Sequence, residues 1–182
     1  MPKMNPHASR SKMLHESQVG PAVTLSGTIT PATVRKVTRL FADTDGPLTI
    51  TICSFGGDLD AAMAMHELMR LRTSAGGVVM TIGVGAVMSA AVLLLAAGSK
   101  GHRVMTRYTR LLYHESSTEV SGPVSRIRSE LGALEATDND FDALIAEYTG
   151  KSLKRVQELY AKGDRWLSAA QALKFGFVDR VI

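Results

Sequence analysis

The sequence predicts an α/β fold built from repeated strand–helix units. The chain has 182 residues, 45% of them hydrophobic, which is enough to bury one sizeable core. Along the chain, β-like runs alternate with runs that carry apolar residues at helical spacing, the order typical of a parallel sheet covered by helices. Residues 48–53 form a continuous apolar-and-threonine run, as in strands buried on both faces. We therefore expect one domain over residues 21–182, preceded by a flexible polar arm over residues 1–20.

The first strand and helix follow the arm. Residues 22–29 alternate in polarity, as a half-exposed strand does. Thr30 and Pro31 then supply an N-cap and a proline at the first helical position, and the helix is expected to reach about Ala42. A turn at Asp45-Gly46-Pro47 leads into the strand described above.

Residues 54–58 read Ser-Phe-Gly-Gly-Asp and separate that strand from a second helix. Glycines in this place can expose backbone amides at the carboxyl edge of a sheet. An ordinary tight turn explains the same residues equally well. His66 lies inside the second helix, where a histidine is more often packed or solvated than reactive.

A stretch without charged residues, 73–99, follows and exceeds the length needed to span a bilayer. Its first four glycines divide it into a strand of about seven residues and a helix of about ten, Met88 to Ala97, both too short to cross. We therefore expect no transmembrane segment. Ser89 is predicted to lie at the strand-to-helix turn, where free amides and the helix dipole can face a developing oxyanion. This position suits a nucleophile, although serines at helix starts usually serve only as caps.

Two short strands, at about 102–105 and 110–114, are expected next. The second ends in His114, where a rigid backbone could hold a catalytic base. A lone histidine at a strand end is more often a hydrogen-bonded surface residue. A polar excursion over residues 116–122 then leads to the long helix described below.

The long helix is predicted over about residues 123–148. Its apolar residues keep a 3-4 spacing that only Asp138 interrupts, and a stripe of that length predicts a partner surface. A helix capped by Ser152, a loop over residues 162–166, a short helix capped by Ser168 and a final strand from residue 176 complete the chain.

Composition excludes several classes of function. The net charge is +4, but basic and acidic residues are mixed and only 5% of residues are aromatic, so we predict no nucleic-acid partner. The single cysteine, Cys53, excludes an internal disulfide and a multi-cysteine metal site, and suits a reducing cytoplasm. Because no apolar segment follows the first basic residues, we expect no secretory signal and a cytoplasmic protein. No phosphate-loop motif is present, and we predict neither a cofactor nor a metal.

Four segments together resemble the Clp protease proteolytic subunit family, and the resemblance extends from about residue 22 to the end. They are Ser-Phe-Gly-Gly-Asp at 54–58, Met-Ser-Ala-Ala-Val-Leu-Leu-Leu-Ala-Ala-Gly-Ser-Lys-Gly-His-Arg at 88–103, Leu-Leu-Tyr-His at 111–114 and Gly-Asp-Arg-Trp-Leu-Ser-Ala at 163–169. The resemblance implies a fold of the Clp protease and crotonase type, with repeated β-α units and a protruding handle helix that matches residues 123–148.

The resemblance also assigns roles to residues. Ser89 would be the nucleophile, His114 the general base and then acid, and Asp164 the carboxylate that orients the imidazole. The backbone amides of Gly57 and Ala90 would form the oxyanion hole. The implied activity is that of a serine endopeptidase that cleaves peptides and unfolded proteins.

The implied assembly is a homo-oligomer, a seven-membered ring that pairs with a second ring through the handles to enclose a chamber. A separate hexameric ATPase of the AAA+ class would thread folded substrates into it. Lys162-Gly163 stands where the family carries an acidic-basic pair that couples ring contact to the triad, so ring pairing is expected to be weaker or differently controlled. Phe55 replaces a proline, and Ala90-Ala91 replaces methionine and glycine, which changes the pocket.

Two other functions compete with the peptidase. A crotonase-type acyl-CoA enzyme also uses paired backbone amides after a glycine-rich turn, but it needs no Ser, His and Asp in this order. An inactive ring component that regulates an active partner would keep the fold and fail to react with a serine-directed probe.

Overall fold

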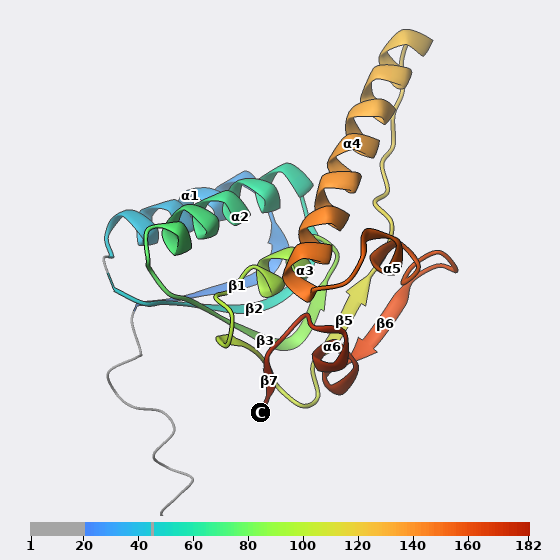
Figure 1. Ribbon diagram of the computed structural model, residues 1–182. Helices are drawn as coiled ribbons and strands as arrows, with labels where there is room; N and C mark the ends of the chain where they lie inside the picture. The colour runs from blue at the N-terminus through green and yellow to red at the C-terminus, as the bar shows by residue number, and fades with distance from the viewer. Residues whose placement is uncertain (1–20, 45) are drawn as a thin grey trace, which may run out of the picture.

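In the computed structural model, which describes residues 21–44 and 46–182, a seven-stranded sheet forms the centre of the structure (Figure 1). Its main path runs β1-β2-β3-β4-β7, while β5 pairs with β3 and β6 with β5. Every pairing is parallel except β5 with β6. The predicted α/β class is confirmed, and the predicted arm over residues 1–20 lies outside the described residues.

The strands and helices have the following bounds. The strands are β1 (Ala22–Ile29), β2 (Leu48–Gly57), β3 (Val79–Met88), β4 (Arg103–Met105), β5 (Arg110–Tyr113), β6 (Arg165–Ser168) and β7 (Arg180–Val181). The helices are α1 (Pro31–Ala42), α2 (Leu59–Ser74), α3 (Ala91–Ala96), α4 (Val124–Thr149), α5 (Leu153–Gln157) and α6 (Ala169–Phe175).

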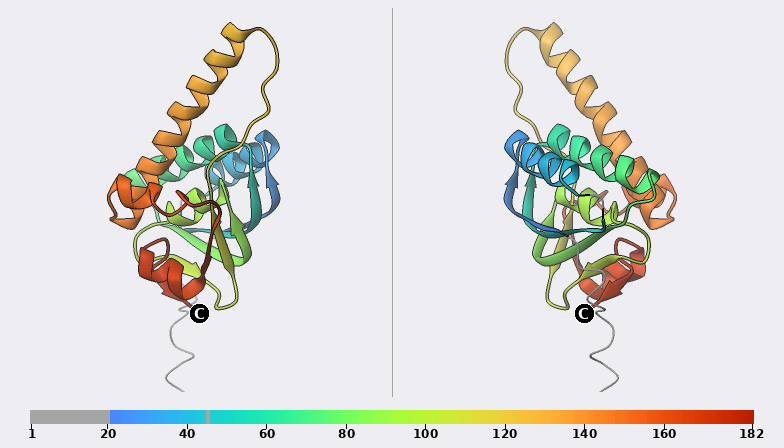
Figure 2. Two further views of the ribbon diagram at one scale, coloured as in Figure 1. Left: turned by 90° about the vertical axis from the view of Figure 1, so that its right-hand side faces the viewer. Right: turned by 90° about the vertical axis from the view of Figure 1, so that its left-hand side faces the viewer.

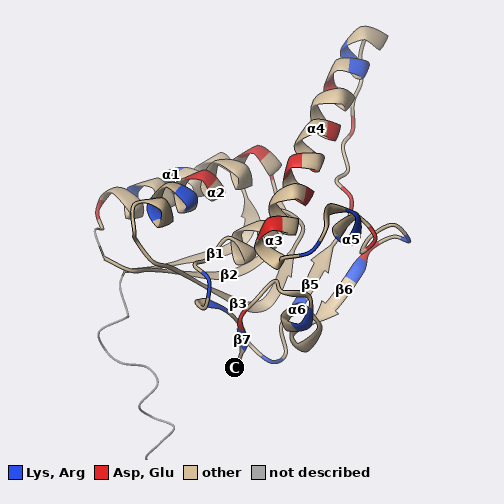
Figure 3. Cartoon of the chain, viewed as in Figure 1, with Lys and Arg blue, Asp and Glu red and all other residues tan. Residues whose placement is uncertain are grey.

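The helices α1 and α2 lie side by side over one face of the sheet, and α4 projects away from the body in all three views (Figures 1 and 2). The helix α3 is buried along its whole length against β2 and β3. Lys and Arg residues are spread over separate elements in the described part of the chain, and acidic residues occur along α4 (Figure 3). Within residues 21–44 and 46–182, none of the helices combines the length and the apolar composition needed to cross a membrane.

Helix starts that were predicted from capping residues are confirmed. Thr30 and Thr33 form a capping box at the start of α1, with Pro31 at its first position. Ser168 and Gln171 form a second capping box at α6. These local side-chain bonds satisfy amides that the first helical turn leaves free, so they can be recognised without tertiary information.

The prediction that glycines end the second and third strands is wrong. Both strands are ten residues long; β2 runs through Gly57, and β3 runs through two glycines to Met88, leaving only six residues to α3. The reason is tertiary pairing. The first half of β3 pairs with β4 and the second half pairs with β5. The edge of β3 that faces away from β2 is therefore paired with another strand in each half. Strand pairing of this kind overrides the low β propensity of glycine.

The loop predicted over residues 162–166 is also partly wrong. Residues from Arg165 form β6, which pairs antiparallel with β5, and Trp166 lies opposite Leu112. Nothing in the four-residue sequence signals this strand, because its partner is distant in the chain. The helix after Ser152, which was expected to reach about Ala161, ends at Gln157.

The helix α4 has 26 residues, which corresponds to about 39 Å. Its inner half buries Phe141 and Ile145 in the core, so part of the predicted apolar stripe packs against the body of the same chain. Its outer half leaves Val124 70% and Leu131 44% exposed. The outer half is therefore the part of the stripe that remains without a partner within the described chain.

An ion pair between Arg103 and Asp179 joins β4 to the segment before β7. The buried guanidinium donates from Nε to Oδ2 at 2.9 Å and from Nη2 to Oδ1 at 2.7 Å. It also donates to the carbonyl of Tyr148, near the end of α4, at 2.9 Å. One arginine thus connects the sheet, the C-terminal segment and the base of the projecting helix.

Candidate active site

Ser89 lies at the turn between β3 and α3 in a left-handed backbone conformation, with φ 53°. Among the described residues, no other residue except glycine has a positive φ. The Ser89 amide donates to the carbonyl of Leu112 at 2.9 Å, and its carbonyl accepts from the Val92 amide at 2.9 Å. A left-handed residue with a Cβ costs about 1–2 kcal/mol, so the neighbouring strand and helix hold this serine in a strained turn.

Gly56, at the end of β2, lies directly against this turn. A Cβ built on Gly56 would be 2.6 Å from the Cβ of Ser89 and 2.8 Å from the carbonyl oxygen of Met88. Its φ of 90° also favours glycine. The Gly56 amide donates to the hydroxyl of Ser54 at 3.1 Å, which fixes the glycine in place. The glycine is needed here because the serine turn and the β2 backbone touch.

We expect Gly56→Ala to lower the rate at which a fluorophosphonate phosphonylates Ser89 by about 10²-fold, because the new methyl group displaces the serine turn. Gly27→Ala on β1 is the matched control. Gly27 also has a positive φ, 75°, but its Cβ would meet nothing within 4 Å. Phosphonylation rates of the two variants, measured beside their free energies of unfolding, separate the clash from the shared backbone penalty. Equal phosphonylation rates in the two variants would contradict this account.

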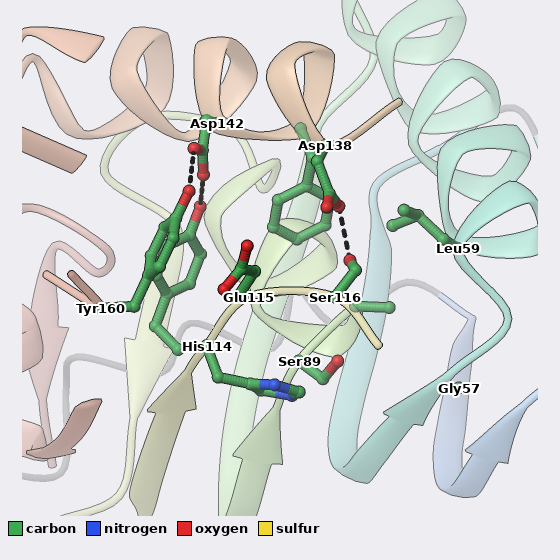
Figure 4. Close-up of a pocket in the computed structure, with 12 residues that line it drawn as sticks. Gly57, Leu59, Ser89, His114, Glu115, Ser116, Asp138, Asp142 and Tyr160 are labelled. Atoms are coloured by element: carbon green, nitrogen blue, oxygen red, sulfur yellow. Dashed lines mark hydrogen bonds between the residues drawn. The ribbon is translucent and has the colours of Figure 1, made fainter. Parts of the chain in front are cut away.

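His114 follows β5 directly and lines the same pocket as Ser89 (Figure 4). In that view the imidazole lies beside Ser89, and both side chains are half-buried. No hydrogen bond joins the two side chains in the part of the chain that the structure describes. Catalytic hydrogen bonds are often long in the absence of substrate and tighten when it binds.

Asp164 and His114 line a hollow next to this pocket, together with Gly163 and Tyr160. Asp164 is exposed, and over residues 21–44 and 46–182 no hydrogen bond joins it to the imidazole. His114 thus lines both the pocket that contains Ser89 and the hollow that contains Asp164, while no hydrogen bond between described residues closes the predicted triad.

Gly57 and Ala90, the residues predicted for the oxyanion hole, both line the pocket that contains Ser89. Within the described residues the Ala90 amide donates to no protein acceptor, so it is free to bind a ligand oxygen. Leu59 and Phe141 supply apolar walls to the same pocket. The pocket thus offers a hydroxyl, an imidazole and a free amide within one small enclosure.

Sequence reasoning missed a group of carboxylates and hydroxyls that also line this pocket. Asp142 on α4 accepts hydrogen bonds from the hydroxyls of Tyr113 and Tyr160. One helical turn earlier, Asp138 accepts from the hydroxyl of Ser116 at 2.5 Å. Burial and the bond to Asp142 raise the pKa of both tyrosines, so they stay protonated as donors. The interruption of the apolar stripe at Asp138 was the available signal for this group.

His66 is packed in the interior, which is one of the two alternatives expected from the sequence. It is fully buried on α2, and its Nε2 lies 2.7 Å from the hydroxyl of Tyr148. Burial lowers the pKa of His66, which favours a neutral imidazole. Among the described residues, no group of three or more His, Cys, Asp or Glu side chains is arranged to hold a metal ion.

A serine on a strained turn between a strand and a helix, with a histidine at the end of the neighbouring strand, is an arrangement typical of α/β proteins that use a serine nucleophile. A family model described as Clp protease matches residues 5–182. The chain belongs to the Clp protease family, which confirms the resemblance seen in the sequence. The match does not favour the acyl-CoA alternative.

Relatives in several bacteria carry the name ATP-dependent Clp protease proteolytic subunit. Subunit 2 of Thermobifida fusca is 32% identical over 140 residues, which cover 77% of this chain and 67% of the relative. Subunit 2 of Rhodococcus jostii is 34% identical and subunit 2 of Treponema pallidum 37% identical, and the aligned parts cover 70% and 66% of those proteins. The aligned region thus spans about two thirds of each of these relatives.

Proposed function

We propose that this chain is a proteolytic subunit of the Clp type, a serine peptidase in which Ser89, His114 and Asp164 act as the triad. The observation that carries the proposal is the strained Ser89 turn, which faces His114 inside one pocket. Family membership supports the reaction class. A strained backbone at one hydroxyl, held from both sides, is typical of a residue that is positioned for chemistry.

In this mechanism Ser89 Oγ attacks the carbonyl carbon of a peptide bond while His114 accepts the hydroxyl proton. The tetrahedral oxyanion receives hydrogen bonds from the amides of Gly57 and Ala90. His114 then gives the proton to the departing amine, and an acyl-enzyme remains on Ser89. Water, deprotonated by the same imidazole, releases the acid and restores the hydroxyl. Asp164 turns toward the imidazole and stabilises its charged form.

The assembly proposed here is a homo-oligomeric ring, seven-membered and able to pair with a second ring. The exposed apolar residues Val124 and Leu131 on the outer half of α4 support a contact between copies. The relatives named as subunits of an ATP-dependent protease support a separate AAA+ ATPase partner. Peptides and unfolded chains would then enter unaided, and folded proteins would need the ATPase.

The test is to offer the purified full-length protein a fluorogenic peptide, a folded fluorescent protein and an acyl-CoA. We expect slow peptide hydrolysis that is independent of ATP, and negligible loss of the folded protein. Equal degradation of the peptide and the folded protein would contradict a gated chamber. Hydrolysis of neither would instead support an inactive ring component. Acyl-CoA turnover would contradict the peptidase.

A further inference from the structure

Asp142 is a buried carboxylate on the inner half of α4 that the proposed mechanism does not use. The residue is 4% exposed. The Tyr113 hydroxyl donates to its Oδ1 at 2.5 Å, and the Tyr160 hydroxyl donates to its Oδ2 at 2.6 Å. Figure 4 shows the two bonds side by side. Burying a carboxylate is costly unless its oxygens are hydrogen-bonded, so the two tyrosines allow Asp142 to occupy this place.

The two tyrosines belong to the segments that carry the other site residues. Tyr113 is the last residue of β5 and directly precedes His114. Tyr160 lies between α5 and Asp164, on the segment that leads to that carboxylate. Asp142 therefore connects three segments that are distant in the sequence: α4, the end of β5 and the approach to Asp164.

The rings that carry these hydroxyls also pack against each other and against neighbouring aromatic rings. The ring centroids of Tyr113 and Tyr160 are 5.6 Å apart. The Tyr113 ring also stacks on Phe141 of α4, at 6.1 Å between centroids, and contacts Phe177 at 6.0 Å. The backbone on which His114 sits is thus held against α4 by an aromatic cluster whose polar end is Asp142.

His114 itself has no such support. In the described residues its side chain makes no hydrogen bond to Ser89 or to Asp164, so the position of the imidazole depends on the backbone that carries it. The same holds for the exposed Asp164. The imidazole of His114 and the carboxylate of Asp164 are therefore positioned by the segments that carry them rather than by contacts with each other.

The geometry assigns Asp142 the role of a positioning residue, which fixes the end of β5 and the Tyr160 segment against α4 so that His114 and Asp164 reach Ser89 together. This inference rests on the proposed function. Asp142 touches no substrate in this role, and the placement of α4 becomes a determinant of the catalytic rate. A displacement of about 1 Å costs on the order of 10²-fold in rate, and loss of one of the two bonds is expected to cost about tenfold.

Tyr148→Phe provides a matched control on the same helix. The Tyr148 hydroxyl also bonds a buried residue, His66, at 2.7 Å, but it does not line the pocket. Tyr148→Phe and Tyr160→Phe each remove one phenolic oxygen and one partly buried hydrogen bond that involves α4. A purely structural role for Asp142 predicts that they lower stability alike and leave the chemical step alone.

The experiment compares Tyr113→Phe, Tyr160→Phe, Asp142→Asn and Tyr148→Phe in the full-length protein, at a temperature where each is folded. We measure the rate at which a fluorophosphonate phosphonylates Ser89 per folded subunit, and kcat and KM for a fluorogenic peptide. In the first three variants the phosphonylation rate and kcat should fall about tenfold with little change in KM. Tyr148→Phe should keep kcat. The double variant Tyr160→Phe/Asp142→Asn should be little slower than the slower single variant, because the residues act as a unit.

Tyr160 is half-buried, so Tyr160→Phe keeps the test decisive even if Asp142→Asn fails to fold. An unchanged kcat in Tyr160→Phe, or an equal fall in Tyr148→Phe, overturns the inference. A wild-type protein that reacts with no serine probe overturns the proposed function instead, and the inference with it.

Discussion

Ser89→Ala is expected to abolish peptide hydrolysis by the purified protein, with a fall in kcat of at least about 10⁴-fold. Without the hydroxyl no acyl-enzyme can form, whereas the amides of Gly57 and Ala90 remain to bind substrate. Alanine keeps a Cβ in the same left-handed turn, so the free energy of unfolding should change little. Hydrolysis of a fluorogenic peptide and intact mass after fluorophosphonate treatment measure the effect.

Substitutions at His114 and Asp164 test whether the proposed triad residues act as a unit. His114→Ala and Asp164→Ala should each be severely impaired, and the double variant should lose little more than the worse single variant. Ser152→Ala, which removes only a helix cap outside the pocket, should keep full reactivity. Hydrolysis by Ser89→Ala above the vector-control background would refute Ser89 as the nucleophile.

Asp179→Ala is expected to lower the free energy of unfolding by about 3–5 kcal/mol, because it leaves the guanidinium of Arg103 buried without its counter-charge. Chemical denaturation at neutral pH measures this. Glu67→Ala, which breaks an exposed pair with Arg70, is the control and should cost at most about 1 kcal/mol. Replacing both partners, as in Arg103→Met/Asp179→Leu, should recover part of the loss.

The pH dependence of this ion pair follows from the direction of the shift. Burial alone would raise the pKa of Asp179, but the hydrogen bonds and charge of Arg103 outweigh it and hold the pKa well below its ordinary value. The stabilisation is therefore complete above the unfolded-state pKa of about 3.9 and is lost as the pH falls toward the folded pKa. The difference between wild type and Asp179→Asn should stay constant from about pH 5 to 8 and shrink below about pH 4. A difference that grows in acid would contradict the assignment.

Features determined by neighbouring residues could be predicted from the sequence, whereas features that depend on pairing between distant segments could not. The start of α1 at Thr30-Pro31 and the capping of α6 by Ser168 were predictable because the determining bonds are local. The continuation of β3 through its glycines and the existence of β6 were not, because both depend on β5. The length of α4 was predictable from its periodicity, but which half packs on the body was not.

The candidate site divides in the same way. The positions of Ser89 and His114 at the ends of strands made them candidates, the family resemblance assigned their roles, and the structure places both in one pocket. Asp142 was not identified, because an acidic residue on a long helix usually faces solvent, and its burial depends on two tyrosines from other segments. The triad roles remain a prediction that rests on family membership and on this geometry.

The left-handed backbone of Ser89 sets two selective pressures against each other at one residue. The turn costs the folded state about 1–2 kcal/mol as long as the residue carries a side chain, and glycine would relieve that cost. Selection for stability alone therefore favours glycine at this position, whereas selection for reactivity favours serine. A descendant of this chain that kept the fold and gave up hydrolysis would be under no pressure to keep the hydroxyl, so this position would be among the first places where loss of activity became visible.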